Sequence, residues 1–219
     1  MKEELAVFKE SLRRFLSAAA DLILLNLLLI LCCLPVVTAG AAWAAGYAYL
    51  LRIIRGVEQS FPFKPFLADF KKTFRTATLG WLLLLLCFAV LAGDYYYAVY
   101  ASDPVNRFFL VFSIVLAIVF LMAALWLFPL MARYENTVRG HIRNAFLMAV
   151  GMFPRTLLAF GVLLLFYGLP MLLPVLFTYL GWLWIAFGLS LPMYIIAYLF
   201  RKPLGCLPEK KPEEEISED

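Results

Sequence analysis

Long runs of apolar residues, separated by short polar segments, dominate the pattern along the chain. The runs Leu22–Leu34 and Trp81–Ala92 are continuous, whereas the strands of a membrane β-barrel would alternate apolar and polar residues. A helix needs about 20 apolar residues to cross a hydrocarbon core roughly 30 Å thick. The pattern therefore predicts an all-α, polytopic transmembrane helical bundle with about six spans.

Six apolar segments reach or approach this length, and prolines interrupt the last two. The expected spans are Ala20–Val37, Ala41–Ile54, Ala77–Ala92, Phe108–Leu130, Thr156–Leu173 and Leu176–Phe200. Because they follow one another closely, we expect residues 1–202 to form a single transmembrane domain. Residues 203–219 are acidic and contain proline, which predicts a disordered cytoplasmic tail.

The second segment is rich in alanine and glycine, which let helix backbones approach closely in lipid. We therefore predict that it is the most buried helix. It is short for a full crossing, so a tilted span and a re-entrant hairpin formed with the first segment both remain open. The candidate packing and polar positions around it are Asn26, Thr38, Gly40, Ala45 and Gly46.

Three other segments carry an apolar stripe at helical spacing, with charged residues elsewhere around the helix. Residues 1–17 predict a helix on the membrane surface before the first span. The segments 63–75 and 132–155 predict interfacial helices on the cytoplasmic side. The exposed cations of these two helices and their exits form our candidate interaction surface: Lys64, Lys71, Lys72, Arg75, Arg139, Arg143 and Arg155.

The charges of the chain indicate its orientation. Only 16% of residues are charged, 64% are hydrophobic, and the mean hydropathy is +0.88, so much of the surface must face lipid. We expect residues 93–106 to form the external loop, and of 19 lysines and arginines only Arg107, directly after this loop, falls on the outer side. The positive-inside bias then places both termini in the cytoplasm. A net charge of +4 without base-stacking elements does not indicate a nucleic-acid partner.

Aromatic residues crowd the expected external loop. Tyrosines stand at positions 95, 96, 97 and 100. Rings of this kind favour the headgroup level of the membrane, because the ring is apolar and the hydroxyl is wet. We therefore favour an aromatic belt over a sugar-binding platform.

An internal repeat with a displacement of 80 residues links the two halves of the chain. A Phe-Leu pair, an Arg-Thr pair and three leucines at positions 66–85 recur at positions 146–165. Both copies run in the same direction, which predicts a symmetry axis along the membrane normal. Such repeats occur in transporters, but duplication also produces them in proteins that transport nothing.

The sequence contains few groups that could perform chemistry. No ionisable residue stands in the middle of a span, and for Asn26 we favour a single hydrogen bond between helices. The one histidine, His141, lies in a polar segment, where we expect it to be solvated. Zinc-protease, nucleotide-binding and CxxC motifs do not occur in the chain. We expect neither an enzyme nor a cofactor.

The amino-terminal two thirds of the chain resemble a known family. The similarity is carried by Asn26, the corner Leu34–Gly40, the alanine-rich segment after it, the stretch Phe66–Lys72 and the entry Arg75–Trp81. The family that they resemble is the YesL-like bacterial membrane protein family, domain of unknown function 624. The exit Phe128–Tyr134 is also similar. The resemblance implies the bacterial plasma membrane and gene neighbourhoods with sugar ABC transporters and sensor kinases, but no known activity or site residues.

From these observations we expect a non-enzymatic membrane protein, an accessory or regulatory component of carbohydrate uptake or sensing. Its expected partners are the lipid bilayer and a sugar ABC permease or sensor kinase. Anionic lipid attracts a cationic surface by about 1 kcal/mol per residue, and a partner protein would use the same charges. The alternative is a small-solute transporter or channel built on the repeat.

Overall fold

The computed structural model describes residues 2–57, 61–100 and 104–206, and every regular element in them is helical. The α-helices are α1 (Lys2–Cys33), α2 (Ala39–Arg55), α3 (Phe63–Tyr100), α4 (Pro104–Arg133), α5 (Val138–Gly151), α6 (Phe153–Leu163), α7 (Leu169–Leu172), α8 (Pro174–Phe187) and α9 (Ser190–Phe200). A short 3-10 helix precedes α2, and a π-helical stretch at 164–168 joins α6 to α7. The predicted all-α class is confirmed.

Five helical segments in the described part of the chain are long and apolar enough to cross a membrane. A sixth consists of two halves, 181–187 in α8 and α9, which meet at an angle of 52°. These numbers agree with the predicted bundle of about six spans. They rest on the length and composition of the helices.

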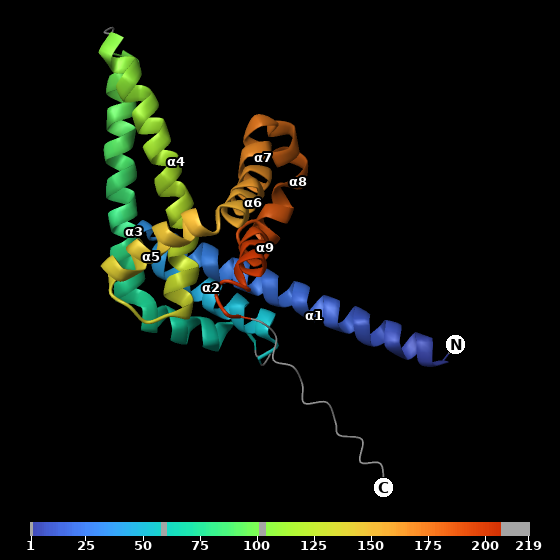
Figure 1. The fold of residues 1–219 in the computed structure, drawn as a ribbon. Coiled ribbons are helices and arrows are strands. Elements are labelled where there is room, and N and C mark those ends of the chain that lie inside the picture. The colour runs from blue at the N-terminus through green and yellow to red at the C-terminus, as the bar shows by residue number, and fades with distance from the viewer. Residues whose placement is uncertain (1, 58–60, 101–103, 207–219) are drawn as a thin grey trace.

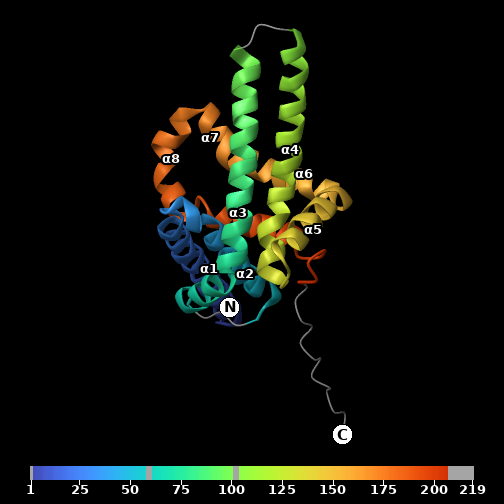
Figure 2. The same ribbon diagram turned by 90° about the vertical axis from the view of Figure 1, so that its left-hand side faces the viewer.

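The helices form an upright part and a transverse part (Figure 1). The helices α3 and α4 form a long hairpin, and α6, α7 and α8 rise beside it. The helix α1 runs across the direction of this hairpin, and the view turned by 90° shows the same arrangement (Figure 2). We call the end that holds α2, the first turns of α3 and α5 the base.

The helix α2 is the centre of the packing. Thirteen of its 17 residues are buried, as its small residues predict. A Cβ on Gly40 would lie 2.6 Å from the carbonyl oxygen of Ala77 in α3. A Cβ on Gly46 would lie 2.9 Å from the methyl carbon of Met193 in α9. Glycine therefore permits both close contacts: at Gly40 a larger residue would meet backbone, and at Gly46 it would displace the end of the Met193 side chain.

Two expected boundaries are wrong, because helices continue where we expected them to end. The surface helix at 1–17 and the first span are one helix, α1, since neither proline nor glycine interrupts residues 2–33. The amphipathic segment 63–75, its span and most of the expected loop 93–106 belong to α3, which ends at Tyr100. Its first turns lie along the base before it rises into the hairpin (Figure 1). The four tyrosines are therefore exposed on a helix.

The break in the last span follows from Pro192, which stands in the first turn of α9. Proline has no N–H to bond the carbonyl four residues earlier, and its ring crowds that carbonyl. That residue is Gly188, where α8 has ended. The Gly188 carbonyl oxygen instead accepts a hydrogen bond of 3.0 Å from the hydroxyl of Tyr167. A side chain thus replaces the missing backbone donor.

The two copies of the repeat have different local structures. The first amphipathic segment continues directly into the rising part of α3, whereas the second, α5, is separated from α6 at Met152. Thr156 is fully buried and accepts a hydrogen bond of 2.9 Å from the indole of Trp126. Its counterpart Thr76 is only half-buried. A parallel symmetry of the whole halves stays a prediction.

The expected tail begins later than predicted. Leu204 and Cys206 are fully buried, and the hydroxyl of Tyr134 donates a hydrogen bond of 3.2 Å to the Leu204 carbonyl. Residues 203–206 are therefore part of the folded body. Residues 207–219 lie outside the described residues, so the disordered tail remains a prediction for them.

Candidate functional site

A polar cavity of about 360 Å³ opens at the base, between the first turns of α3, the end of α4 and the start of α5. Its floor is apolar and its walls are mostly polar or charged. The lining residues are Ala48, Asp69, Lys72, Thr73, Thr76, Met131, Ala132, Arg133, Tyr134, Glu135, Asn136 and His141. We call it the base cavity.

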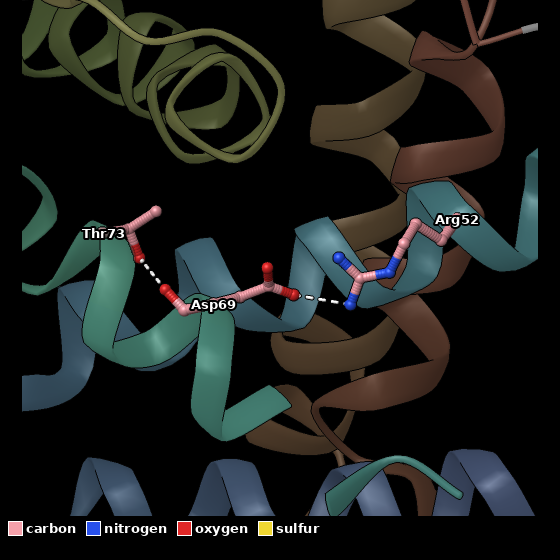
Figure 3. Close-up of polar contacts among 3 residues, drawn as sticks. All are labelled: Arg52, Asp69 and Thr73. Carbon is pink, nitrogen blue, oxygen red and sulfur yellow. Dashed lines mark hydrogen bonds and ion pairs between the residues drawn. The ribbon is translucent and has the colours of Figure 1, made fainter. Parts of the chain in front are cut away.

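The α3 wall is fixed by an ion pair with α2 (Figure 3). A guanidinium nitrogen of Arg52 lies 2.5 Å from Oδ2 of Asp69, and both side chains are partly buried. The hydroxyl of Thr73 donates a hydrogen bond of 2.9 Å to the Asp69 carbonyl, one turn earlier. Partial burial limits screening by salt, so this pair holds the start of α3 against α2.

The opposite wall is the connection between α4 and α5. Glu135 accepts a hydrogen bond of 2.7 Å from the ammonium of Lys72 across the cavity mouth, and this bond lowers the pKa of the Glu135 carboxyl. Both side chains are largely exposed, so the pair orients the walls more than it stabilises them. The hydroxyl of Thr137 accepts a hydrogen bond from the backbone N–H of Gly140 and caps α5.

His141 is the least exposed polar group of the cavity. Its side chain is 2% exposed, although we expected a solvated histidine. It shares one face of α5 with Ala145 and Ala149, both buried, and this spacing of four residues is the signal that could have revealed its burial. Burial lowers the pKa of the imidazole, so the ring is neutral at neutral pH and offers one donor and one acceptor.

The predicted cationic surface divides into three parts. Lys64, Lys71, Lys72 and Arg75 are exposed on the first turns of α3, and Arg139 and Arg143 are exposed on α5. Arg155, by contrast, is partly buried at the start of α6, 3.9 Å from the sulfur of Met152. Of these seven, Lys72 alone lines the base cavity, whereas Arg139 and Arg143 line a second hollow of about 400 Å³ on α5.

Sequence reasoning missed several residues of the base cavity. Asp69, Arg133 and Glu135 were not among the candidates, because each stands in a segment that could equally be a solvated surface. The available signal was the polar stretch Arg133–Asn136, which directly follows an apolar run. In the parts of the chain that the structure describes, no three His, Cys, Asp or Glu side chains come together as a metal site would require.

Asn26 forms a second polar centre, and none of its hydrogen-bond partners among the described residues lines the base cavity. It is fully buried in α1, and its Oδ1 accepts hydrogen bonds of 2.8 and 2.9 Å from the backbone N–H groups of Leu189 and Ser190. Its Nδ2 donates one of 2.6 Å to the carbonyl of Ile185. These three bonds, where we expected one, join α1 to both sides of the break between α8 and α9.

The remaining predicted packing residues have structural contacts. Ala45 is fully buried, and Gly40 and Gly46 are buried at the close approaches described above. The hydroxyl of Thr38 donates to the carbonyls of Cys32, at 2.6 Å, and Pro35, at 2.9 Å. Thr38 thereby gives the Cys32 carbonyl a partner at the end of α1, where the helix itself supplies none.

Comparison with known proteins finds a similarity to one family over part of the chain. Residues 22–95 match a family described as "Protein of unknown function, DUF624". The comparisons with curated proteins and with solved structures found no match. The matched region includes Asn26, α2 and the α3 wall of the base cavity, but not the connection between α4 and α5. Over residues 22–95 the chain is therefore similar to the DUF624 family.

Proposed function

We propose that the protein is a non-enzymatic integral membrane protein that docks a partner on its base, as an accessory or regulatory component of carbohydrate uptake or sensing. The observation that carries the proposal is the arrangement of the two amphipathic helices. Phe66 of α3 and Ala145 and Ala149 of α5 are buried, and six cations are exposed on the first turns of α3 and on α5. The role in carbohydrate uptake or sensing is supported by the resemblance alone.

The proposed setting is the bacterial plasma membrane, with the base and both termini in the cytoplasm. The support is the concentration of lysine and arginine at the base, because cytoplasmic segments carry the excess of these residues. The expected partner surface is an acidic cytoplasmic segment of a sugar ABC permease or a sensor kinase. Opposite charges would steer the encounter and fix its register, and high salt would weaken it.

Charge reversal at the base tests the proposal. The variant Lys71→Glu with Lys72→Glu should lose the partner, and so should Arg139→Glu with Arg143→Glu. Because Lys72 also holds Glu135, a third variant, Lys71→Glu with Arg75→Glu, leaves that pair intact. The apolar residues of both helices are unchanged in all three variants, so the protein should still insert and fold.

The measurement is recovery of permease or kinase subunits, identified by mass spectrometry, after cross-linking in membranes and purification at matched expression. A matched control reverses Lys9 and Arg13, which are exposed on α1 away from the base. The proposal expects the control to recover the partner as the wild type does. Equal recovery from all four variants would refute it and leave the two helices as membrane anchors.

A small-solute transporter or channel is the second candidate, and the broken last span favours it. Transporters often build their sites from discontinuous helices near the middle of the membrane. Here the side chains of Asn26 and Tyr167 form hydrogen bonds with the backbone at the break. Such bonds are expected both where side chains stabilise a broken helix and where they border a solute-binding site. Solute flux in proteoliposomes that contain the purified protein alone would favour transport over docking.

A further inference from the structure

The charges that line the base cavity alternate on both of its walls. The α3 wall presents Asp69 and Lys72, and the α4–α5 wall presents Arg133 and Glu135. Any ligand with a single sign of charge therefore meets a like charge on each wall. A ligand that carries both signs can pair with both walls, because its two charges can each lie beside an opposite one.

Two nitrogen groups of the cavity are available to a phosphate. Among the described residues, the His141 ring has no hydrogen-bond partner, although it is almost fully buried. The guanidinium of Arg133 forms no ion pair with them and lies 5.8 Å from the ring centroid of Tyr134. The ring borders the cavity, so its N–H can donate a hydrogen bond to a bound acceptor. Arginine binds phosphate oxygens with two parallel donors.

The carboxylates of the cavity can accept hydrogen bonds from an ammonium. Asp69 uses Oδ2 for Arg52, which leaves Oδ1 as an acceptor. Glu135 is largely exposed at the cavity mouth and can exchange Lys72 for a ligand. The last carbonyls of α4 end at the same wall, and the C-terminal end of a helix favours positive charge.

The position of the cavity indicates where such a ligand comes from. The apolar span in α4 ends at Arg133, so the cavity lies where a membrane helix leaves the hydrocarbon. Phospholipid headgroups occupy this level. A volume of about 360 Å³ is within the range of small-molecule sites and suits a headgroup better than a whole lipid.

We propose that the base cavity binds a zwitterionic headgroup with a phosphate and a primary ammonium a few atoms apart, as in phosphatidylethanolamine. The phosphate contacts Arg133 and His141, and the ammonium contacts Asp69 and Glu135. This proposal is independent of the proposed docking function, because lipid should occupy the base cavity whether or not a partner protein is bound. A free zwitterion of the same chemistry, phosphoethanolamine, is the other possible source.

The experiment measures binding to the purified full-length protein in detergent by isothermal titration calorimetry. The probes are dihexanoyl lipids with ethanolamine, choline or glycerol headgroups, together with free phosphoethanolamine. The ethanolamine lipid should bind about tenfold more tightly than the glycerol lipid, which is an anion, and than the choline lipid, which lacks N–H donors. Tighter binding of the lipid than of free phosphoethanolamine assigns the site to membrane lipid, and equal binding assigns it to the soluble zwitterion.

Two substitutions of exposed residues test the assignment without disturbing the core. Arg133→Gln and Glu135→Gln should each weaken ethanolamine-lipid binding about tenfold, as the loss of a charge-assisted hydrogen bond predicts. Arg75→Gln, an exposed cation of α3 that does not line the cavity, should stay within about twofold of wild type. Equal binding of the glycerol lipid, or unchanged binding in both cavity variants, would overturn the proposal.

Discussion

Replacing Asn26 by leucine removes the side chain that joins α1 to the break in the last span. Leucine has a similar volume and leaves the backbone N–H groups of Leu189 and Ser190 and the carbonyl of Ile185 without this partner. Asn26 is fully buried, so water cannot easily take its place. We expect the variant to be less stable, with the largest effect on the contact of α1 with α8 and α9.

The magnitude follows from the three bonds. Hydrogen bonds between membrane helices contribute about 0.6 kcal/mol each on average, which sets a lower limit near 2 kcal/mol. Stranding a buried donor costs about 1–3 kcal/mol, and two N–H groups are stranded. We therefore expect the free energy of unfolding to fall by about 2–6 kcal/mol. Tyr167→Phe, which removes one bond to Gly188, should cost about 1 kcal/mol.

The assay is equilibrium unfolding in mixed micelles, monitored by tryptophan fluorescence and circular dichroism. Tyr179→Phe is the matched control, because Tyr179 is 74% exposed. It should unfold as the wild type does. A change of less than about 0.5 kcal/mol for Asn26→Leu would refute the reasoning, because it would mean that the three bonds do not hold the break.

Three further predictions concern packing, pH and topology. Gly46→Leu should lower the free energy of unfolding by about 1–3 kcal/mol, because the larger side chain overpacks the core. Gly93→Leu, with no atom in its way, should leave it nearly unchanged, and equal unfolding of both variants would contradict this prediction. Stability should fall as the pH drops below 6.5, the ordinary imidazole value, because the unfolded chain binds a proton that buried His141 resists. His141→Gln should reduce this slope, and an unchanged slope would exclude His141 as its source. In a cysteine-free background, an impermeant thiol reagent should label a cysteine at Ser102 in intact cells but not one at Ser60, and labelling at Ser60 would contradict the proposed orientation.

The helical class and the burial of α2 could be predicted, because both depend on local composition. Helix boundaries were less predictable. The amphipathic pattern of residues 1–17 suggested a separate surface helix. No proline or glycine separates these residues from the first span, so the backbone continues as one helix. Pro192 does locate the break at Gly188, by the rule that proline disrupts the carbonyl four residues earlier. The sequence does not reveal that Tyr167 supplies the replacement donor.

The sequence by itself determined which segments avoid water, where small residues permit close packing and where positive charge gathers. These properties follow from each residue and its near neighbours. Only the tertiary structure decided that Asn26 meets a carbonyl 159 positions away, and that His141 and Asp69 line one cavity. Hydrogen bonds extend about 3 Å, so such partners are fixed by how whole helices pack, and periodicity within one helix carries no information about them.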